Sequence, residues 1–342
     1  MRASAQPLCY ACGGPGEPLH AGLRDAIAKA PGEWTLKRCR DPDCRLVWMD
    51  PMPLPEDIHV AYERYYTHRD PDDTPAAASS NVLRRVYARI EDDYVSQRYG
   101  YPSERSRLAA TLSGSLAYLM PLHRPNMDFG VMCLRSRPFG TLLEIGCGSG
   151  AALRMMANRG WRVRGLDFDA QAVESARRKG LAVDLGDVRA QRYAAQSFDA
   201  ITMNHVIEHA HDPRSLLREC HRLLAPGGAL AIATPNPDGL GHRWFGRNWR
   251  GLETPRHLYL YPPRTLARLV AESSFEKLSW KSTIRGAQWS LADSVRIRAR
   301  ARGRDAPVSA PVAARVLQAL EWAALAIDTH AGDETAILAF KG

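Results

Sequence analysis

The chain has 342 residues, 45% of them hydrophobic, and a net charge of +9. This is enough for a full α/β core with a smaller appended unit. No apolar run reaches the roughly 18 residues of a membrane span, and the first residues lack the apolar core of a signal peptide. Seven cysteines, an odd number without a secretion signal, argue against a disulfide framework and favour a reducing cytoplasm. We therefore exclude membrane-spanning and disulfide-stapled secreted proteins.

Four of the cysteines form two pairs near the N-terminus. Cys9 and Cys12 have two residues between them, 26 residues then precede Cys39, and four more separate it from Cys44. Two pairs on separate turns supply the four thiolates of a tetrahedral Zn²⁺, whereas buried thiols that merely pack need no such spacing. The second gap is wider than the usual two residues, so Cys44 is the ligand whose spacing is least typical of a zinc site. We predict a closed, structural zinc ribbon over residues 1–55.

A second N-terminal segment follows the cysteines. Prolines 51, 53 and 55 predict a stiff extended turn, and residues 56–66 predict a short helix that ends in a tyrosine cluster. Residues 70–80 are polar and proline-bearing and predict a loop. Residues 82–99 and 105–118 predict two helices. We expect residues 56–135 to form a helical lid or linker.

Residues 142–150 are the most informative stretch of the chain. Leu142–Ile145 predict a short buried strand, Gly146–Gly150 a tight turn, and Ala151 opens a helix whose free N–H groups can face a ligand. A strand, glycine turn and helix make a nucleotide-type pocket at the carboxyl edge of a parallel sheet. Because Gly146, Gly148 and Ala151 also satisfy the dinucleotide pattern, with Asp167 placed for a ribose, the turn alone leaves a nicotinamide dehydrogenase open.

Further motifs decide between these cofactors. In order, they are Glu144 before the turn, Gly165-Leu166-Asp167, Gly186-Asp187-Val188, the segment from Phe198 to His209, and Leu223–Gly228 before a fifth strand. This series, from Leu142 to about Thr234, resembles the class I S-adenosylmethionine-dependent methyltransferases, in the small-molecule branch related to ubiquinone-biosynthesis methyltransferases. The resemblance implies a Rossmann-like α/β domain over residues 136–342 with a seven-stranded sheet. The zinc ribbon, proline turn and tyrosine cluster resemble the N-terminal module of bacterial methyltransferases in polysaccharide and natural-product pathways.

The resemblance also implies which residues bind the cofactor. The glycine turn would hold its methionyl part, Asp167 its ribose hydroxyls, and Asp187 with the Val188 N–H its adenine. Asn204 and His205 would lie between cofactor and acceptor. The complete expected set is Glu144, Gly146, Cys147, Gly148, Gly150, Asp167, Phe168, Asp187, Val188, Asn204 and His205.

Two distant segments are rich in aromatic and imidazole groups, and we expect them to form two walls of an acceptor pocket. The residues concerned are Tyr62, Tyr66, His68, Trp249, Arg256 and His257. An acceptor with an acidic proton needs a base, and imidazole titrates near neutral pH. We predict His257 first and His205 second as that base, with His68 and His209 competing.

The C-terminal third carries a predicted helical insertion at about residues 286–333. Five arginines alternate with small or apolar residues over positions 296–304, and without interleaved aromatic residues we interpret them as a solvated helix surface. The apolar stripe of residues 312–327 predicts a helix that packs on the core or on a second subunit of a homodimer.

The sequence therefore predicts an S-adenosylmethionine-dependent methyltransferase that acts on a small-molecule acceptor and yields S-adenosylhomocysteine. A catalytically silent scaffold that keeps the cofactor fold is one alternative. A methyltransferase for nucleic acid or a carrier-bound substrate is another, disfavoured because Asn204-His205-Val206 stands where an Asn-Pro-Pro-Tyr motif would be expected.

Overall fold

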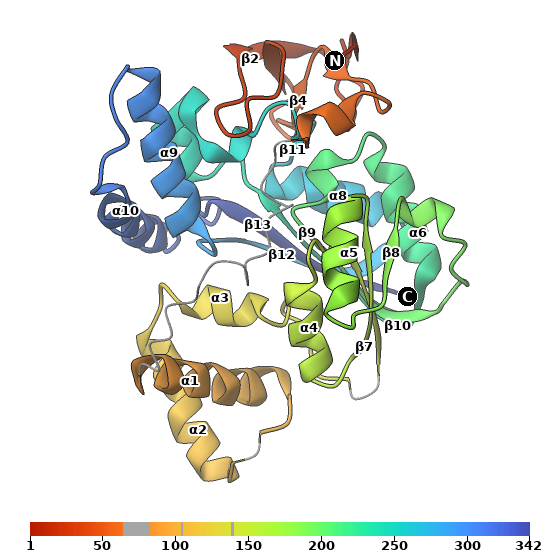
Figure 1. Ribbon diagram of the computed structural model, residues 1–342, viewed down its shortest axis with the longest axis vertical. Helices are drawn as coiled ribbons and strands as arrows, with labels where there is room; N and C mark the ends of the chain where they lie inside the picture. The colour runs from red at the N-terminus through yellow and green to blue at the C-terminus, as the bar shows by residue number, and fades with distance from the viewer. Residues whose placement is uncertain (64–81, 104, 138–139) are drawn as a thin grey trace. The chain divides into compact units, whose positions relative to one another are not determined.

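The computed structural model describes residues 1–63, 82–103, 105–137 and 140–342 (Figure 1). Seven strands form one sheet in the order β12-β13-β10-β9-β6-β7-β8. Strands β6, β7, β8 and β9 pair in parallel. The bounds of the sheet strands are β6 Thr141–Ile145, β7 Arg162–Asp167, β8 Val183–Leu185, β9 Phe198–Asn204, β10 Leu224–Pro235, β12 Phe275–Thr283 and β13 Glu334–Lys341. The predicted α/β fold with a seven-stranded sheet is confirmed.

The central strands β6 and β9 are mostly buried, as parallel strands covered by helices require. Leu142 and Leu143 of β6 are completely buried. Helices α4 (Ala151–Asn158), α5 (Ala170–Arg178) and α6 (Pro213–Leu223) alternate with the strands along the chain. Asp169 caps α5 by accepting the Gln171 N–H at 2.9 Å, which fixes where β7 ends and the helix begins.

The cysteine-bearing segment forms a separate antiparallel sheet in the order β11-β4-β3-β2. Its strands are β2 Gly16–Leu23, β3 Trp34–Cys39, β4 Val47–Met49 and β11 Tyr259–Leu260. Tyr259 lies opposite Trp48 across the β11–β4 pair, so a segment some two hundred residues further along the chain completes this sheet. A small pair, β1 (Ala3–Ser4) with β5 (Met52–Pro53), and the 3-10 helix η1 (Ile58–Ala61) follow the same segment.

Three helices precede the sheet: α1 Val82–Tyr99, α2 Arg107–Ser115 and α3 Arg124–Phe129, with the 3-10 helix η4 at Leu116–Leu119. The helix predicted over residues 82–99 is confirmed with the same bounds, and α2 with η4 accounts for the helix predicted over 105–118. The buried Tyr94 and the adjacent Tyr99 both donate hydroxyl hydrogen bonds to Asp128 at 2.7 Å, which ties α1 to α3.

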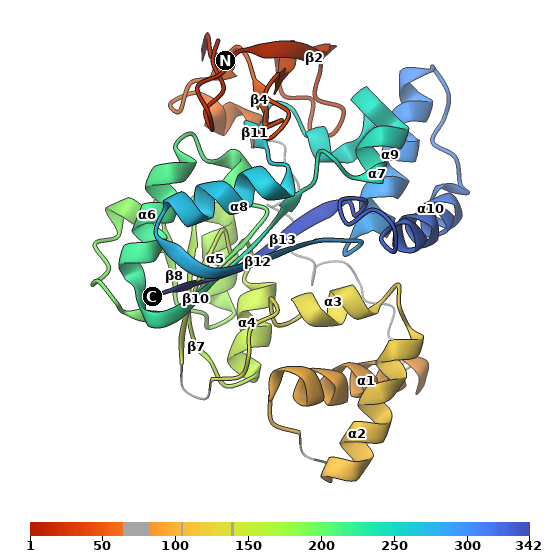
Figure 2. The same cartoon turned by 180° about the vertical axis from the view of Figure 1, so that it is seen from behind.

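The C-terminal third contains α7 (Leu240–Phe245), the 3-10 turns η7 (Gly246–Asn248) and η8 (Arg250–Leu252), α8 (Pro263–Glu272), α9 (Ala287–Ala301) and α10 (Ala310–Ala324). The short 3-10 turns η5 (Val188–Ala190) and η6 (Ile207–His209) occur earlier in the chain. Helices α9 and α10 lie side by side in both views (Figures 1 and 2). They form the predicted insertion between β12 and β13.

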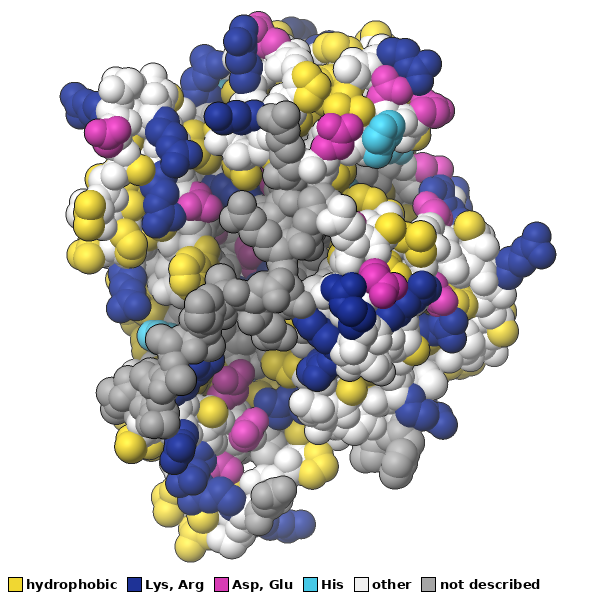
Figure 3. All heavy atoms as spheres, in the orientation of Figure 1, with side chains coloured by type: hydrophobic (Ala, Val, Ile, Leu, Met, Phe, Trp, Pro, Cys, Tyr) yellow, Lys and Arg dark blue, Asp and Glu magenta, His cyan; other side chains and the backbone are white. Residues whose placement is uncertain are grey.

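The arginines of positions 296–304 begin on α9 and continue past its end. Arg296 pairs with Asp293 at 2.7 Å, and the Arg298 guanidinium stacks 4.0 Å from the Phe245 ring centroid. Positively and negatively charged side chains are interspersed on the face seen in Figure 3. These contacts agree with the prediction that the arginines form a solvated helix surface.

The described chain forms two compact units. One comprises Met1–Tyr66, Asn204–His221 and Ile232–Ala339, and the other Thr67–Met203, Arg222–Ala231 and Phe340–Gly342. The domain boundaries predicted at residues 55 and 135 stay predictions. Among the helices that the structure describes, none combines the length and apolar character needed to cross a bilayer.

Candidate active site and metal centre

The glycine turn after β6 has the geometry that its sequence predicts. Gly146, Gly148 and Gly150 have φ angles of 73°, 53° and 81°, a region that residues with a side chain rarely adopt. A Cβ on Gly148 would meet no described atom within 4 Å, so this glycine borders open space. The turn can therefore receive a ligand against its backbone.

Asp167, at the end of β7, is joined to this turn. Its Oδ2 accepts the Gly148 N–H at 2.7 Å and its Oδ1 accepts the Asp169 N–H at 2.9 Å, so the carboxylate fixes the loop while keeping further lone pairs. Burial raises the pKa of Asp167. Glu144 is also buried, its Oε2 has no partner within the described residues, and burial and then the Asp167 charge raise its pKa to about 8. An unpartnered buried carboxyl oxygen beside a glycine turn fits a polar ligand.

Two further predicted cofactor residues lie in the same unit. Phe168 is 58% exposed directly after Asp167. The Asp187 carboxylate accepts the backbone N–H of Arg189 and pairs with its guanidinium at 2.6 Å, and the Arg189 hydrogen bond lowers the pKa of Asp187. Cys147 is buried, as is Val188 at the start of η5.

His205 occupies a charged network at the carboxyl end of β9. Its Nδ1 lies 3.2 Å from Glu208 Oε1 and its Nε2 lies 2.9 Å from Glu334 Oε1. Partial burial opposes the charged imidazolium, but the hydrogen bonds to Glu208 and Glu334 outweigh it and raise the pKa of His205 to about 9. His205 is therefore protonated at neutral pH, with both nitrogens donating to carboxylates.

Arg285 extends this network from the end of β12. Its Nε donates to Glu334 Oε2 at 2.6 Å and its Nη2 donates to Asn204 Oδ1 at 2.7 Å. Asn204, predicted to face the cofactor, is thus oriented by an arginine. Sequence reasoning missed Arg285 and Glu334. The available signal was their position at strand ends, one just after β12 and one opening β13.

His257 has the opposite protonation state. Its Nδ1–H donates to the Gly251 carbonyl at 2.8 Å, so in the neutral ring Nε2 carries the lone pair. Burial lowers the pKa of His257 to about 4. The Nε2 atom lies 4.0 Å from Glu208 Oε1 and 3.7 Å from Glu253 Oε2, so carboxylates would stabilise an imidazolium formed there.

Tyr62 and His209 lie beside His257. The Tyr62 hydroxyl is 2.9 Å from His209 Nδ1, which also donates to the Arg256 carbonyl at 3.0 Å. The His209 and His257 rings meet edge to face with centroids 4.8 Å apart. The structure thus brings together the predicted Tyr62 and His257, whereas Tyr66 and His68 lie outside the described residues.

Two predicted acceptor residues are engaged within the protein. The Arg256 guanidinium, 0% exposed, pairs with Asp25 at 2.7 Å and with Glu253 at 3.1 Å. Trp249 is buried and donates its indole N–H to Asp333 at 2.8 Å. Both side chains therefore hold neighbouring loops, and their contact with an acceptor stays a prediction.

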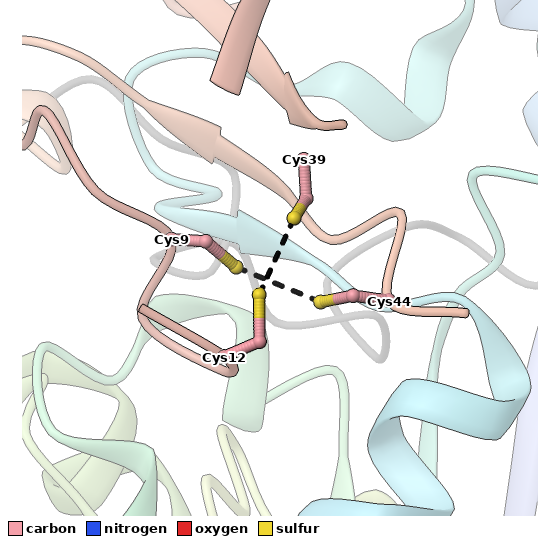
Figure 4. A group of neighbouring side chains, drawn as sticks. All are labelled: Cys9, Cys12, Cys39 and Cys44. Carbon is pink, nitrogen blue, oxygen red and sulfur yellow. Dashed lines mark hydrogen bonds between the residues drawn. The ribbon is translucent and has the colours of Figure 1, made fainter. Parts of the chain in front are cut away.

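The four N-terminal cysteines converge on one point from two loops (Figure 4). The Sγ atoms of Cys9 and Cys44 are 3.6 Å apart, and those of Cys12 and Cys39 are 3.4 Å apart. A tetrahedral Zn²⁺ with Zn–S bonds of about 2.3 Å needs sulfur separations of about 3.8 Å, so the donor set fits the metal with a small expansion. Cys44, despite its irregular spacing, belongs to the cluster, and the Thr265 hydroxyl of α8 donates to its carbonyl.

Comparison with known proteins identifies the family. A family model described as a methyltransferase domain matches residues 105–279, just over half of the chain. The chain belongs to this family. The predicted resemblance to class I S-adenosylmethionine-dependent methyltransferases is confirmed.

Similar proteins cover part of the chain. Ubiquinone biosynthesis O-methyltransferase of Pseudomonas paraeruginosa is 38% identical over 103 residues, 28% of this chain and 44% of that protein. Its counterpart in Klebsiella pneumoniae is 36% identical over 129 residues, 35% of this chain and 53% of that protein. The chain thus spans about half the length of the curated relatives it matches. Among solved structures, phosphoethanolamine N-methyltransferase 2 of Haemonchus contortus has a TM-score of 0.47 and 16% identity, covering 86% of this chain and 63% of that chain.

Proposed function

We propose that this protein is an S-adenosylmethionine-dependent methyltransferase with a small-molecule acceptor. The observation that carries the proposal is the strand–turn–helix at residues 141–158, with its three left-handed glycines and Asp167 bonded to the turn, in a chain of the methyltransferase family. The name of the ubiquinone biosynthesis relatives supports a small-molecule acceptor and O-methylation among the candidate reactions.

The residues of the turn suit this cofactor. The open side of Gly148 admits the methionyl part against the backbone, the Asp167 carboxylate can accept from both ribose hydroxyls, and the exposed Phe168 offers a stacking face to adenine. Asp187 and the Val188 N–H complete the expected adenine contacts, and Glu144 lies behind the turn. The open side of the turn and the unpartnered Glu144 oxygen favour a bound ligand here.

Methyl transfer requires positioning, exclusion of water and removal of one proton from a hydroxyl acceptor. When bound, the cofactor supplies an activated methyl group on a sulfonium. We assign proton removal to His257, because its Nε2 is unprotonated at neutral pH and faces carboxylates that stabilise the imidazolium. The proton of the acceptor O–H would pass to His257 Nε2, and the cofactor, held by the glycine turn and Asp167, would supply the methyl group to the acceptor oxygen.

His205 suits a different task. Because its imidazole is charged and donates to Glu208 and Glu334, it is a poor base. We propose that it fixes the carboxyl end of β9, where Asn204 is held by Arg285. Tyr62, joined to His209, is the described residue that we assign to the acceptor wall.

We further propose that Cys9, Cys12, Cys39 and Cys44 hold one structural Zn²⁺ per chain. The convergence of the four sulfurs supports this, and four thiolate ligands leave no open coordination position for chemistry. Reduced thiolates also agree with the predicted cytoplasmic location. Elemental analysis of protein purified without chelator tests the assignment: one zinc per chain is expected, and zinc-free folded protein would remove it.

The exposed stripe of α10 supports a homodimer as a proposal. Val312, Val316 and Leu320 recur every four residues and are 67%, 57% and 54% exposed. Sedimentation of the wild-type chain and of a Val316→Glu variant tests it, since a charge in an apolar interface should give monomers.

The function itself is tested with methyl-labelled S-adenosylmethionine and separate small-molecule and polymer fractions of a bacterial extract. We expect label in the small-molecule fraction and one S-adenosylhomocysteine per methyl transferred. Label in nucleic acid or on a carrier protein would favour a methyltransferase that acts on nucleic acid or on a carrier-bound substrate. Cofactor binding without any transfer would favour the silent scaffold.

A further inference from the structure

A cavity of about 620 Å³ lies where the cysteine-bearing sheet meets α7 and α8, outside the residues assigned to the cofactor and the base. Its walls include Arg38 of β3, Arg45 directly after Cys44, Arg243 of α7 and Arg264 of α8. All of these residues belong to the same compact unit. The volume is within the roughly 300–1,000 Å³ of small-molecule sites.

The carboxylates in this wall do not serve all of the arginines. Three carboxylates line the cavity: Asp238 pairs with Arg45 at 3.2 Å, Asp328 pairs with Arg243 at 2.8 Å, and Asp43 forms no ion pair with the described residues. Arg38 has no ion pair within the described chain, and its Nε is buried without a hydrogen-bond partner. Asp238 and Glu17 lie near enough to favour the charge of Arg38, but neither forms an ion pair with it, so an anion in the cavity would give this guanidinium a direct partner.

Arg264 adds a second available charge. Its side chain is exposed at the start of α8 and lines the same cavity. Like Arg38, it makes no ion pair with the described part of the protein. Two guanidinium groups on different elements can therefore face one ligand, and guanidinium geometry matches phosphate oxygens in bidentate pairs.

Two histidines of the wall, His20 and His242, bond to each other. His242 Nδ1–H donates to the Pro237 carbonyl at 2.7 Å, so His242 Nε2 accepts from His20 Nε2–H at 3.0 Å. Burial and then the positive charges nearby lower the pKa of His20 to about 4. His330 has a buried Nδ1 without a partner, which makes it a second unsatisfied polar atom of the wall.

We propose that this cavity binds a phosphate-bearing small molecule through Arg38 and Arg264. The guanidinium groups without ion pairs point to an anion, and the volume suits a small molecule. The proposal concerns a site separate from the glycine turn and does not depend on methyl transfer.

Calorimetry of the full-length chain with pyrophosphate at low and moderate salt tests the proposal. We expect saturable binding that weakens as salt rises, because the interaction is ionic. Arg38→Met and Arg264→Met should each weaken binding at least tenfold. Arg302→Met, which removes an exposed arginine beyond the end of α9, is the matched control and should bind as the wild type does.

Three results would overturn the proposal. They are no binding of pyrophosphate by the wild type, equal binding by Arg264→Met and Arg302→Met, or citrate binding more tightly than pyrophosphate. Arg264 is exposed, so its variant keeps the test valid if Arg38→Met does not fold. S-adenosylmethionine affinity, measured in the same samples, should stay unchanged in all variants, which separates this site from the cofactor site.

Discussion

The glycine turn and the charged cluster around His205 and His257 are built in opposite ways. The turn is continuous in sequence, and its backbone conformation follows from three glycines within five residues. The cluster joins residues that are far apart, since His205 and Glu334 are 129 positions from each other. Local sequence can therefore predict the first region, whereas the second exists only once the chain has folded.

The two regions also use charge differently. Asp167 accepts backbone N–H groups and keeps lone pairs for a ligand, whereas the carboxylates of the cluster are occupied by protein cations. Changes at the turn should therefore affect ligand affinity first. Changes in the cluster should affect stability and turnover.

The largest effect is expected at Arg256. Arg256→Met leaves the buried Asp25 carboxylate without its cation, whereas Glu253 keeps its ion pair with Arg250, and this should lower the free energy of unfolding by about 3–5 kcal/mol. Urea unfolding measures this loss. Arg304→Met, an exposed change, should alter stability by less than about 0.5 kcal/mol. A small loss at Arg256 would place that guanidinium with the acceptor instead.

His257→Ala should lower turnover about a hundredfold or more and leave S-adenosylmethionine affinity intact, because general-base catalysis contributes roughly 10²–10⁴. With a base of pKa about 4, turnover of the wild type should fall as the pH drops through that value and stay level above about pH 5. His59→Ala, at an exposed histidine, is the control. Near-normal turnover of His257→Ala would mean that another group, or none, takes the proton.

A smaller effect is expected at His205. Its pKa is raised from the ordinary value of 6.5 to about 9, so the charged imidazolium stabilises the fold fully below pH 6.5, and this stabilisation is lost as the pH rises to 9. Because the side chain is 36% exposed, we expect solvent screening to limit the effect to about 1 kcal/mol. The stability difference between wild type and His205→Gln should shrink over that pH range. A difference that grows instead would mean that the histidine is neutral in the folded protein.

The sequence predicted the glycine turn and the four cysteines because each depends on residue spacing, whereas the seven-stranded sheet followed from the resemblance to the methyltransferase family. The sequence favoured His257 over His205 as the general base, but it could not show the environment of each ring, which is the physical reason for that order. Only the fold places Glu334 and Arg285 on His205, or the Gly251 carbonyl on His257. It also treated Arg256 as an acceptor contact, although Asp25, 231 positions away, engages its guanidinium.

The central claim is that the glycine turn and Asp167 bind S-adenosylmethionine, and calorimetry of that ligand tests it most directly. The wild type should bind, and NAD should not compete. Asp167→Ala removes the ribose acceptor, with charge-assisted hydrogen bonds of about 1.5–3 kcal/mol each, and should weaken binding at least tenfold. The control variant Asp305→Ala, changed at an exposed position, should bind S-adenosylmethionine as the wild type does. Equal affinity of the wild type and a folded Asp167→Ala variant would contradict the assignment.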